Sequence, residues 1–440
     1  MRTTVKKWKF DIKADFHHWA VGAGFFSSHA LYMSSNSGYQ RVFSGVYDCG
    51  TNRSRTILER EVDEFLRVSG KEHDVLWISH YDIDHIKGLP VLKNRQATFR
   101  TVYAPHLTPE TRFYMFATSL GSNSDDADLV EDLSGFIANP EAYLADLSDE
   151  VLFVEPAGDG TSDPEAEPED NSGIEIGGES EENLSDWTVT TDFSKGVTNN
   201  AYTLSVKKRG SKKNSTPIWR WSHIMLTDPH SLQDSFLDEF ATRLGRSRQS
   251  LNRSLSIASD VFDFIINHRK ELKDALKKVA KAAGTTIDTA TNDSSLLMSS
   301  TPTTRPTAYR CWRTRSEQRI VPAPRPEIGA WNIQPGWVAF GDAPLGLMPE
   351  FSQVKKWISA YGESVGVLCL PHHGSAKHQS ADLYQLFPAH PSAVVGADGQ
   401  YQHPSYKTVC QAACYGCSFV VVAEEVRARF THSSTVKFTS

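Results

Sequence analysis

Four potential metal ligands are crowded into the segment SHYDIDHIKG at residues 79–88. They are His80, Asp82, Asp84 and His85, and they come directly after the apolar run VLWI. From an extended backbone His80 and Asp82 can point the same way, whereas Asp84 and His85 enter a turn at the start of the next helix. Two adjacent sets of imidazole and carboxylate groups suit two divalent cations a few ångströms apart. The spacing therefore predicts a dinuclear metal site.

A dinuclear site needs further ligands from distant parts of the chain. Asp342 in FGDAPL and the pair His372 and His373 in LPHHGS each come directly after a buried apolar run. Loops at the carboxyl ends of strands in an α/β sheet meet at one edge, where ligands bind. A hydrogen-bonded cluster without metal is the alternative for residues 80–85 alone. The recurrence of ligand residues after strands is stronger evidence for metal than any one segment.

Strands and helices alternate around these segments. Residues 8–50 alternate apolar and polar residues between Gly and Asn turns, which predicts antiparallel strands. Residues 57–70 predict an amphipathic helix that ends at Gly70, and DVLWIS at 74–79 predicts a buried strand. Later strands are expected at 336–343, 364–375 and 392–397. The pattern is that of an α/β protein whose site lies at the carboxyl ends of strands.

A region at 120–285 interrupts this alternation. Its parts are an acidic loop (158–183), a hairpin (199–226) with the basic tip KKRGSKK at 207–213, and a helical block (231–283). The acidic loop is interpreted as a solvated insertion. The basic tip is a candidate for contact with a phosphate backbone, although most such tips face water. Residues 299–330, rich in Ser, Thr, Pro and Arg, predict an irregular connection.

The composition limits the class of protein. The chain has 440 residues, of which 39% are apolar and 22% charged, as in folded globular proteins. No apolar run approaches the roughly 20 residues that span a bilayer, and the N-terminus lacks the apolar core of a secretion signal. We therefore expect a soluble, cytoplasmic protein with no membrane partner. The net charge of −7 argues against a globally basic nucleic-acid binder.

Six cysteines are too few for a secreted disulfide framework. Cys410, Cys414 and Cys417 have a spacing that could hold zinc or an iron–sulfur cluster. They also lie on one face of a predicted helix that can end at Gly416, with SFVVVA as the next strand. The structural interpretation is favoured.

The order of the motifs resembles that of the metallo-β-lactamase-fold hydrolases. The chain has HxDxDH followed by Gly-Leu-Pro, then Gly-Asp-Ala, then His-His-Gly-Ser. More narrowly it is similar to the branch formed by the soluble domain of the DNA-uptake protein ComEC and its stand-alone relatives, in which Asp82 replaces a histidine of the usual HxHxDH. VGAGFF, VYDCG, TNDSSLLM at 291–298 and QHPS at 402–405 also match. The likeness covers roughly residues 8–110 and 287–430.

This resemblance implies a fold and a ligand set. The fold would be one αββα sandwich domain over residues 1–440, with 120–285 as a large, mainly helical insertion. His80 and Asp82 would bind the first ion, and Asp84 and His85 the second. Asp342 would bridge the ions or lie close to both. Which of the two histidines, His372 or His373, completes the site stays open.

Further residues have supporting roles by the same comparison. Asp48 would orient a ligand histidine, and Asn292 and Ser294 stand where many superfamily members have another metal-binding histidine. His403, with Asp84, is a candidate catalytic residue, because its imidazole could give a proton or hydrogen bond to the substrate; a structural role is equally compatible with a lone loop histidine. The residues after the His-His-Gly turn that could meet a substrate phosphate are Ser375 and Lys377.

The resemblance implies a nuclease or phosphodiesterase that acts on DNA, and stand-alone relatives of this kind occur in bacterial antiphage defence. Because one fold hosts many reactions, hydrolysis of a small ester, lactam, lactone, thioester or cyclic nucleotide is the alternative. A third possibility is a regulatory subunit with a structural metal site, in which the 120–285 region binds a partner protein.

The donor atoms predict which ion activates the protein. A carboxylate at Asp82 in place of imidazole makes the ligand set harder and more anionic, which shifts the preference from zinc toward manganese or magnesium. We expect Mn²⁺ to support the highest hydrolytic rate, with Zn²⁺ and Mg²⁺ as the alternatives, when metal-free protein is assayed with each ion. Activity with zinc and none with manganese would contradict this expectation.

Overall fold

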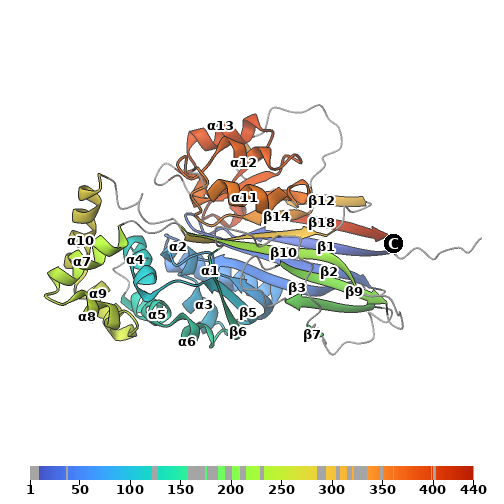
Figure 1. Ribbon diagram of the computed structural model, residues 1–440. Helices are drawn as coiled ribbons and strands as arrows, with labels where there is room; N and C mark the ends of the chain where they lie inside the picture. Colours follow the sequence, from blue (N-terminus) through green and yellow to red (C-terminus); the bar gives the residue numbers. More distant parts are fainter. Residues whose placement is uncertain are drawn as a thin grey trace, which may run out of the picture.

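Two β-sheets face each other in the protein, and helices cover the outer face of each (Figure 1). The computed structural model describes residues 9–35, 38–120, 127–156, 174–175, 187–193, 201–208, 215–227, 232–284, 294–303, 308–314, 320–321, 334–346, 350–359, 361–397, 399 and 403–439. The layers follow the order helix, sheet, sheet, helix. The expected αββα sandwich is therefore confirmed.

The first sheet has eight strands in the order β12-β18-β1-β2-β3-β4-β5-β6. Strands β1, β2 and β3 form the expected antiparallel meander. Strands β3, β4, β5 and β6 run parallel to one another. The bounds are β1 (Lys9–His18), β2 (Phe26–Ser35), β3 (Gly38–Cys49), β4 (Glu72–Trp77), β5 (Thr98–Pro105), β6 (Ser148–Val154), β12 (Ala308–Thr314) and β18 (Phe430–Thr439).

The second sheet has ten strands in the order β13-β17-β16-β15-β14-β11-β10-β9-β8-β7. Strands β14 to β17 are parallel, and the others pair antiparallel. The bounds are β7 (Ile174–Glu175), β8 (Trp187–Phe193), β9 (Ala201–Lys208), β10 (Thr216–Thr227), β11 (Ser294–Pro302), β13 (Ile320–Val321), β14 (Gly336–Ala339), β15 (Val365–Cys369), β16 (Ser392–Gly396) and β17 (Ser418–Val422).

Helices follow the parallel strands and cover the sheets. In Figure 1, α11, α12 and α13 lie on one side of the two sheets, and α1 and α3 lie on the other. The helices are α1 (Arg55–Ser69), α2 (Ile83–Ile86), α3 (Leu89–Asn94), α4 (Pro109–Ser119), α5 (Ala127–Ala138), α6 (Pro140–Leu144), α7 (Gln233–Arg243), α8 (Arg248–Ser254), α9 (Ala258–Ile266), α10 (Arg269–Ala282), α11 (Glu350–Ser359), α12 (Ala381–Gln385) and α13 (Tyr406–Cys414), with short 3-10 turns at η3 (Gly362–Ser364), η4 (His372–Gly374) and η6 (Val426–Ala428).

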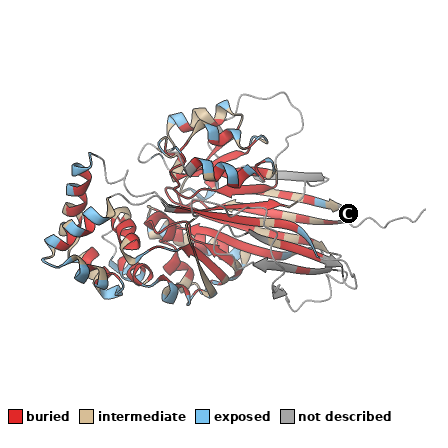
Figure 2. Cartoon of the chain, viewed as in Figure 1, coloured by how far each residue is buried: buried red, intermediate tan, exposed pale blue. Residues whose placement is uncertain are grey.

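Aromatic side chains fill the space between the sheets. Phe43 of the first sheet packs against Trp221 of the second with ring centroids 4.1 Å apart, and Phe16 packs against Trp337 at 5.1 Å. All four are buried, and Figure 2 shows that buried residues are concentrated in the sheets. Because large aromatic rings each remove a great deal of apolar surface from water, this layer holds the two sheets together.

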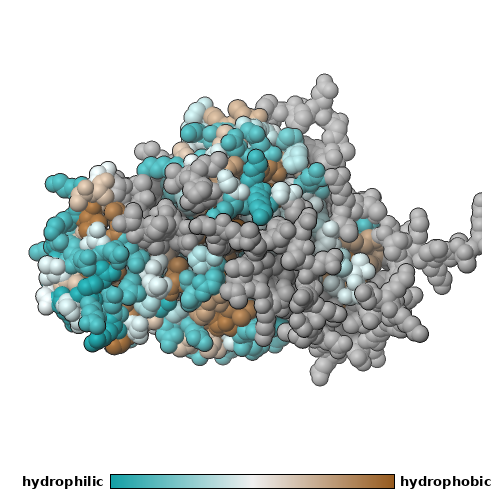
Figure 3. All heavy atoms as spheres, in the orientation of Figure 1, coloured by the Kyte–Doolittle hydropathy of each residue, from teal (hydrophilic) through white to brown (hydrophobic). Residues whose placement is uncertain are grey.

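The 120–285 region contributes to both the helices and the second sheet. The expected helical block corresponds to α7–α10, and the expected hairpin is β9 and β10, whose second strand pairs with β11. In the view of Figure 3, hydrophilic residues dominate the surface over α7–α10. The acidic loop 158–183 lies outside the described residues except for the two residues of β7, and the tip of the basic hairpin lies outside them from 209 to 214.

The connection at 299–330 is more regular than its composition predicts. The end of β11 falls within it, and so do β12, which pairs with β18, and β13, which pairs with β17. Both β12 and β13 lie at the edge of a sheet. An unpaired sheet edge offers backbone hydrogen bonds to a neighbouring segment whatever its side chains are, which composition does not reveal.

The predicted helix and the strand after it are both present in the cysteine segment, but Cys417 lies beyond the helix rather than on its face. Cys410 and Cys414 lie on α13, and the chain turns at Gly416, with φ of 77°, before Cys417 and β17. Cys49, Cys369, Cys410, Cys414 and Cys417 are free thiols. Among the helices described, none has both the length and the apolar character that crossing a membrane requires.

An ion pair joins α1 to the C-terminal part of the chain. Glu61 on α1 is fully buried, and its carboxylate accepts two hydrogen bonds from Arg429, at 2.7 and 3.0 Å. Arg60 and the backbone N–H of Ala20 also donate to Glu61, at 2.8 and 3.1 Å. A buried carboxylate is stable only while such donors compensate for its lost hydration.

Replacement of Arg429 by methionine should lower the free energy of unfolding by about 2–3 kcal/mol, because it leaves the Glu61 charge only partly compensated. Urea unfolding followed by tryptophan fluorescence measures the change. The matched control is the exposed Arg427, whose replacement by methionine should cost no more than about 0.5 kcal/mol. Equal stabilities of the two variants would show that the Arg429–Glu61 pair does not stabilise the fold.

Candidate metal centre

The ligand segment 79–85 leaves the end of β4 and turns sharply into α2. The carbonyl of Asp84 accepts from the N–H of Phe25 at 3.0 Å, and the N–H of Ile83 donates to the Ser119 hydroxyl of α4 at 3.1 Å. Gly50 allows the close approach, since a Cβ at this position would collide with the backbone of Asp84. The loop is thus fixed on both sides, which holds its polar side chains in one orientation.

Two neighbouring parallel strands bring in the other candidate ligands. Strand β14 is followed by Asp342, and β15, its parallel partner, is followed by the His372–His373 pair. The N–H of His372 donates to the carbonyl of Gly341 at 3.1 Å, and the N–H of Asp342 donates to the Ser295 hydroxyl at 3.1 Å. Adjacent parallel strands end at the same edge of the sheet, so their loops meet over the ligand segment.

His80, His85 and Asp342 form the first group of potential ligands. Their ligand atoms all lie within 4.8 Å of one another, and all three residues are buried. The Asp342 carboxylate lies 3.7 Å from His80 Nε2 through Oδ2 and 3.3 Å from His85 Nε2 through Oδ1. One carboxylate therefore faces two imidazoles, as a shared ligand would.

Asp84, His85 and His373 form a second group of the same kind. His373 Nε2 lies 2.8 Å from Asp84 Oδ2, and His85 Nε2 lies 4.0 Å from the same oxygen. His85 thus belongs to both groups. Donor atoms of two overlapping groups can hold two cations only a few ångströms apart.

The outer nitrogen of each of these imidazoles is held by a fixed partner. His85 Nδ1 lies 2.8 Å from the Asp48 carboxylate, and His80 Nδ1 lies 2.8 Å from the Ser79 hydroxyl. Ser79 in turn donates to Asp48 through its hydroxyl and its N–H, both at 2.6 Å. His373 Nδ1 lies 2.7 Å from the Gly396 carbonyl. A partner at Nδ1 fixes the ring and directs Nε2 inward, which is how ligand histidines are oriented in metal sites.

Burial and mutual repulsion set the charges of the carboxylates. Burial, together with Asp84 and Asp342, raises the pKa of Asp82 well above its usual value. Burial also raises the pKa of Asp342, but the neighbouring imidazoles outweigh it and hold that pKa well below its usual value. In Asp84, His85 and His373 outweigh burial and lower the pKa to about 2. Asp84 and Asp342 therefore carry negative charge in a buried cluster, where water solvates them poorly.

The histidines respond in opposite directions. Burial, with repulsion from His85, lowers the pKa of His80 to about 3, so this imidazole is neutral at pH 7. Burial also lowers the pKa of His85, but Asp48 and Asp342 outweigh it and raise that pKa well above its usual value. A proton on His85 offsets part of the carboxylate charge, and a cation could take its place.

The unsatisfied polar atoms of the cluster fit bound cations. His80 Nε2, His85 Nε2 and Asp82 Oδ1 are buried and make no hydrogen bond within the described part of the chain. A buried polar atom without a partner is costly, whereas lone pairs directed at a cation are satisfied. The residues present therefore suit divalent metal ions.

Two predicted ligands lie beside these groups rather than in them. Asp82 Oδ2 is 3.8 Å from His80 Nε2, so it lies within reach of the first group. His372 contacts Asp342 Oδ2 at 3.0 Å through Nδ1. His373 belongs to the second group, whereas His372 belongs to neither group. The geometry thus separates two histidines that the sequence left equivalent.

The remaining predicted residues are spread around the centre. Asn292 lies outside the described residues, and Ser294 begins β11, where only its backbone is described. Ser375 is buried in the turn after His373, and Lys377 is exposed. His403 lies edge-on to His372, with ring centroids 5.5 Å apart. Asp48 holds the position that was predicted for an orienting residue.

Three residues of the centre were not found from the sequence. Ser79 links Asp48 to His80, and Ser295 fixes the backbone of Asp342. His378 stacks on His372 with ring centroids 4.2 Å apart. Serine is too common for its type to predict a role, but Ser79 directly precedes the ligand segment and Ser295 directly follows the predicted Ser294. That proximity was the only available signal.

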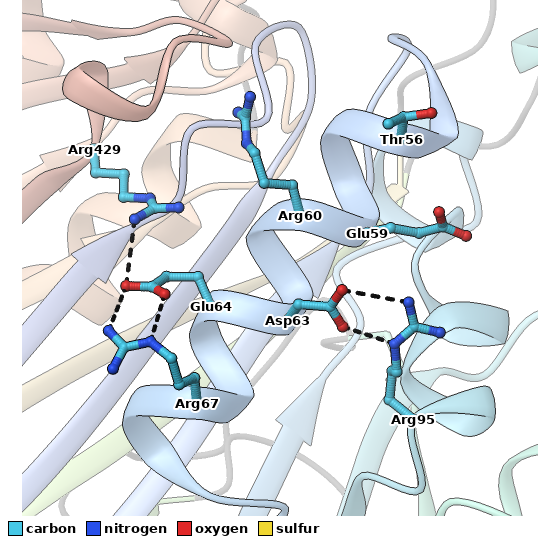
Figure 4. Close-up of a pocket in the computed structure, with 8 residues that line it drawn as sticks. All are labelled: Thr56, Glu59, Arg60, Asp63, Glu64, Arg67, Arg95 and Arg429. Atoms are coloured by element: carbon cyan, nitrogen blue, oxygen red, sulfur yellow. Dashed lines mark hydrogen bonds and ion pairs between the residues drawn. The ribbon is translucent and has the colours of Figure 1, made fainter.

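A separate surface pocket lies over α1 (Figure 4). Its arginines are paired with acids: Arg95 with Asp63, and Arg67 with Glu64. The lining contains no residue of the two ligand groups. It consists of Thr56, Glu59, Arg60, Asp63, Glu64, Arg67, Arg95 and Arg429. The cations and anions of this pocket thus largely neutralise each other.

Comparison with known proteins assigns the class of domain. Residues 45–179 match the model of the metallo-beta-lactamase superfamily, and this range includes the end of β3, all of β4 and the ligand segment. The chain therefore contains a metallo-β-lactamase domain. That domain, together with the buried histidine and aspartate groups, supports a metal-dependent hydrolase.

The other comparisons are weaker. No curated protein matches the chain. Among solved structures, a long form of RNase Z from yeast is similar to it at 9% identity and a TM-score of 0.25, over 81% of this chain and 32% of that one. The chain thus spans about a third of the length of that structure. A likeness this weak does not bear on function.

Substitution of Asp48 by asparagine should weaken Mn²⁺ binding by about 10- to 100-fold, because the ligand His85 loses the partner that fixes its ring. Calorimetric titration of the metal-free protein measures the affinity. The matched control is the exposed Asp149, whose substitution by asparagine should leave the affinity unchanged. An unchanged affinity in Asp48→Asn would mean that His85 is not oriented for a metal by this carboxylate.

Proposed function

We propose that the protein is a metal-dependent phosphodiesterase that hydrolyses DNA with two divalent ions, Mn²⁺ being favoured. The observation that supports it is the pair of overlapping ligand groups that share His85; among the described residues, His80 Nε2 and His85 Nε2 are buried and have no hydrogen-bond partner. Sites with two ions a few ångströms apart are typical of enzymes that cleave phosphodiesters.

Each ion would have its own set of residues. His80 and Asp82 would hold one ion, and Asp84 and His373 the other, with Asp342 and His85 between them. His373 is assigned in preference to His372 because its Nδ1 is held by the Gly396 carbonyl and its Nε2 faces Asp84. When bound, two divalent ions would supply an activated water and stabilise the negative charge that develops on the phosphate.

The protein's own side chains would prepare this site. Asp48 and Ser79 fix the rings of His85 and His80, so little reorganisation is needed when substrate arrives. Burial lowers the pKa of His403 to about 4, with His372 adding to the effect. At pH 7 this imidazole is neutral, and it would give a hydrogen bond to a substrate oxygen rather than act as a strong acid.

DNA is proposed as the substrate on the order of the motifs. The HxDxDH, Gly-Asp-Ala and His-His-Gly-Ser series, which resembles that of the ComEC-like branch, supports a role in DNA cleavage. The same resemblance is the reason to propose bacterial antiphage defence as the biological setting. The paired strands β9 and β10 carry the basic tip that could guide a phosphate backbone toward the site.

Substitution of Asp84 by asparagine should reduce Mn²⁺-dependent cleavage of labelled DNA by more than the roughly 100-fold that loss of an outer-shell partner can cause. The physical reason is the loss of a charged ligand from one ion. Cleavage of single- and double-stranded DNA is followed by gel electrophoresis, with Asp149→Asn as the control that should cleave like the wild type.

Two outcomes would contradict the proposal. Equal cleavage by Asp84→Asn and wild type would show that the activity does not come from this centre. Turnover of a chromogenic lactam or ester by the wild type, without cleavage of DNA or RNA, would assign the site to small-molecule hydrolysis. RNA cleavage in place of DNA cleavage would retain the chemistry and change the substrate.

A further inference from the structure

A third set of imidazoles lies beside the two ligand groups. His372, His378 and His403 are neighbours, and His372 contacts Asp342 of the first group. The side chain of His372 is 18% exposed, compared with 3% for Asp342. These imidazoles therefore line the more open side of the centre.

The rings of His372 and His378 are stacked face to face. Their planes differ by 3° and their centroids are 4.2 Å apart, whereas His403 meets His372 at 88° and 5.5 Å. Parallel rings at this centroid distance are in van der Waals contact. His378 thus restricts the rotation of the His372 ring about its side-chain bonds.

The backbone holds this stack in place. His372 and His373 both have left-handed φ values, of 45° and 52°, which non-glycine residues adopt at a cost and only where the surroundings hold them. The N–H of Ser375 donates to the His372 carbonyl at 2.9 Å, and the N–H of His378 donates to the Ser375 carbonyl at 3.3 Å. The turn that begins at His372 therefore brings His378 back into contact with the His372 ring.

The loop is also packed from outside. A Cβ at Gly346, in the loop that follows Asp342, would collide with the carbonyl of Lys377, so the two loops are in contact. The N–H of Ser405 donates to the Gly374 carbonyl at 3.1 Å, which fixes the segment that carries His403. Three loops therefore hold the stacked pair.

His378 contributes the face of its ring rather than a charge. Its Nδ1 is buried and makes no hydrogen bond to the described residues. Burial, with repulsion from His372, lowers the pKa of His378 to about 3, so the ring is neutral at pH 7. A neutral ring with a buried nitrogen is suited to packing.

We propose that His378 is a positioning residue of the metal centre, which orients His372 by stacking and through it holds the Asp342 carboxylate between the two ligand groups. His372 contacts Asp342 Oδ2, and the same carboxylate faces His80 and His85. A carboxylate shared between two sites must keep both oxygens in place. The inference rests on the proposed function only in that divalent ions bind at this centre.

The competing role for His378 is direct contact with substrate through a ring nitrogen. Two substitutions separate the roles. His378→Phe keeps a flat ring of similar size and removes both nitrogens, whereas His378→Ala removes the stack. A positioning residue is rescued by phenylalanine, and a hydrogen-bonding residue is not.

Mn²⁺ affinity, measured by calorimetric titration of metal-free protein, is the first readout. We expect His378→Ala to weaken binding by about three- to tenfold, which is less than the 10- to 100-fold typical of a partner bonded directly to a ligand. His378→Phe should stay within about twofold of the wild type. His268→Ala, which removes a histidine of the helical block, is the control and should bind like the wild type, and thermal unfolding identifies variants that fail to fold.

The imidazole N–H resonance of His372 is the second readout. In metal-free protein labelled with ¹⁵N-histidine, the signal is assigned by its loss in His372→Gln. Because the Nδ1 proton is shared with Asp342, the signal should persist in His378→Phe and broaden or shift in His378→Ala.

Either of two results would overturn the proposal. One is wild-type Mn²⁺ affinity in His378→Ala, and the other is an equal loss of affinity in His378→Phe and His378→Ala. Neither readout depends on the substrate. If the wild type cleaves no DNA while Mn²⁺ affinity follows the expected order, the proposed function fails and the positioning role is retained.

Discussion

The protein concentrates acidic side chains in one largely buried cluster. Asp48, Asp82, Asp84 and Asp342 are all buried within one cluster, where separated carboxylates repel strongly and have lost their hydration. Burial and repulsion from Asp84 and Asp342 raise the pKa of Asp82, and attraction to Asp48 and Asp342 raises the pKa of His85 in spite of burial. Divalent cations would relieve the repulsion between the carboxylates more completely. The need for counter-charge explains why carboxylates and imidazoles are interleaved here.

The fold holds this cluster through hydrogen bonds to the backbone of the ligand loops as well as to the ligand side chains. The ligand segment is held by Phe25 and Ser119, and Asp342 by Ser295, each through a backbone group. Side-chain partners such as Asp48 then set the rings. Because the two sheets pack through large buried aromatics, the loops at their edges start from rigid positions. Small errors in ligand placement are thereby avoided, and metal and substrate would meet a prepared site.

The helical block is linked to the metal centre through α4. Phe113 on α4 packs with Phe236, Phe240 and Phe264 of the block, and Ser119 at the end of the same helix contacts the ligand segment. Helix α4 therefore contacts both the ligand segment and the helical block α7–α10.

The sequence alone determined the elements and the ligand types, because apolar periodicity and ligand residues at strand ends are local signals. It predicted the meander, the helix at 57–70 and the convergence of residues 80–85 with Asp342. It did not separate His372 from His373 or find His378, since ring orientation depends on partners such as Gly396 that are distant in sequence. Composition likewise missed β12, whose partner β18 is distant in the chain. Pairing at a sheet edge and the direction of a ring nitrogen are decided only when distant segments meet.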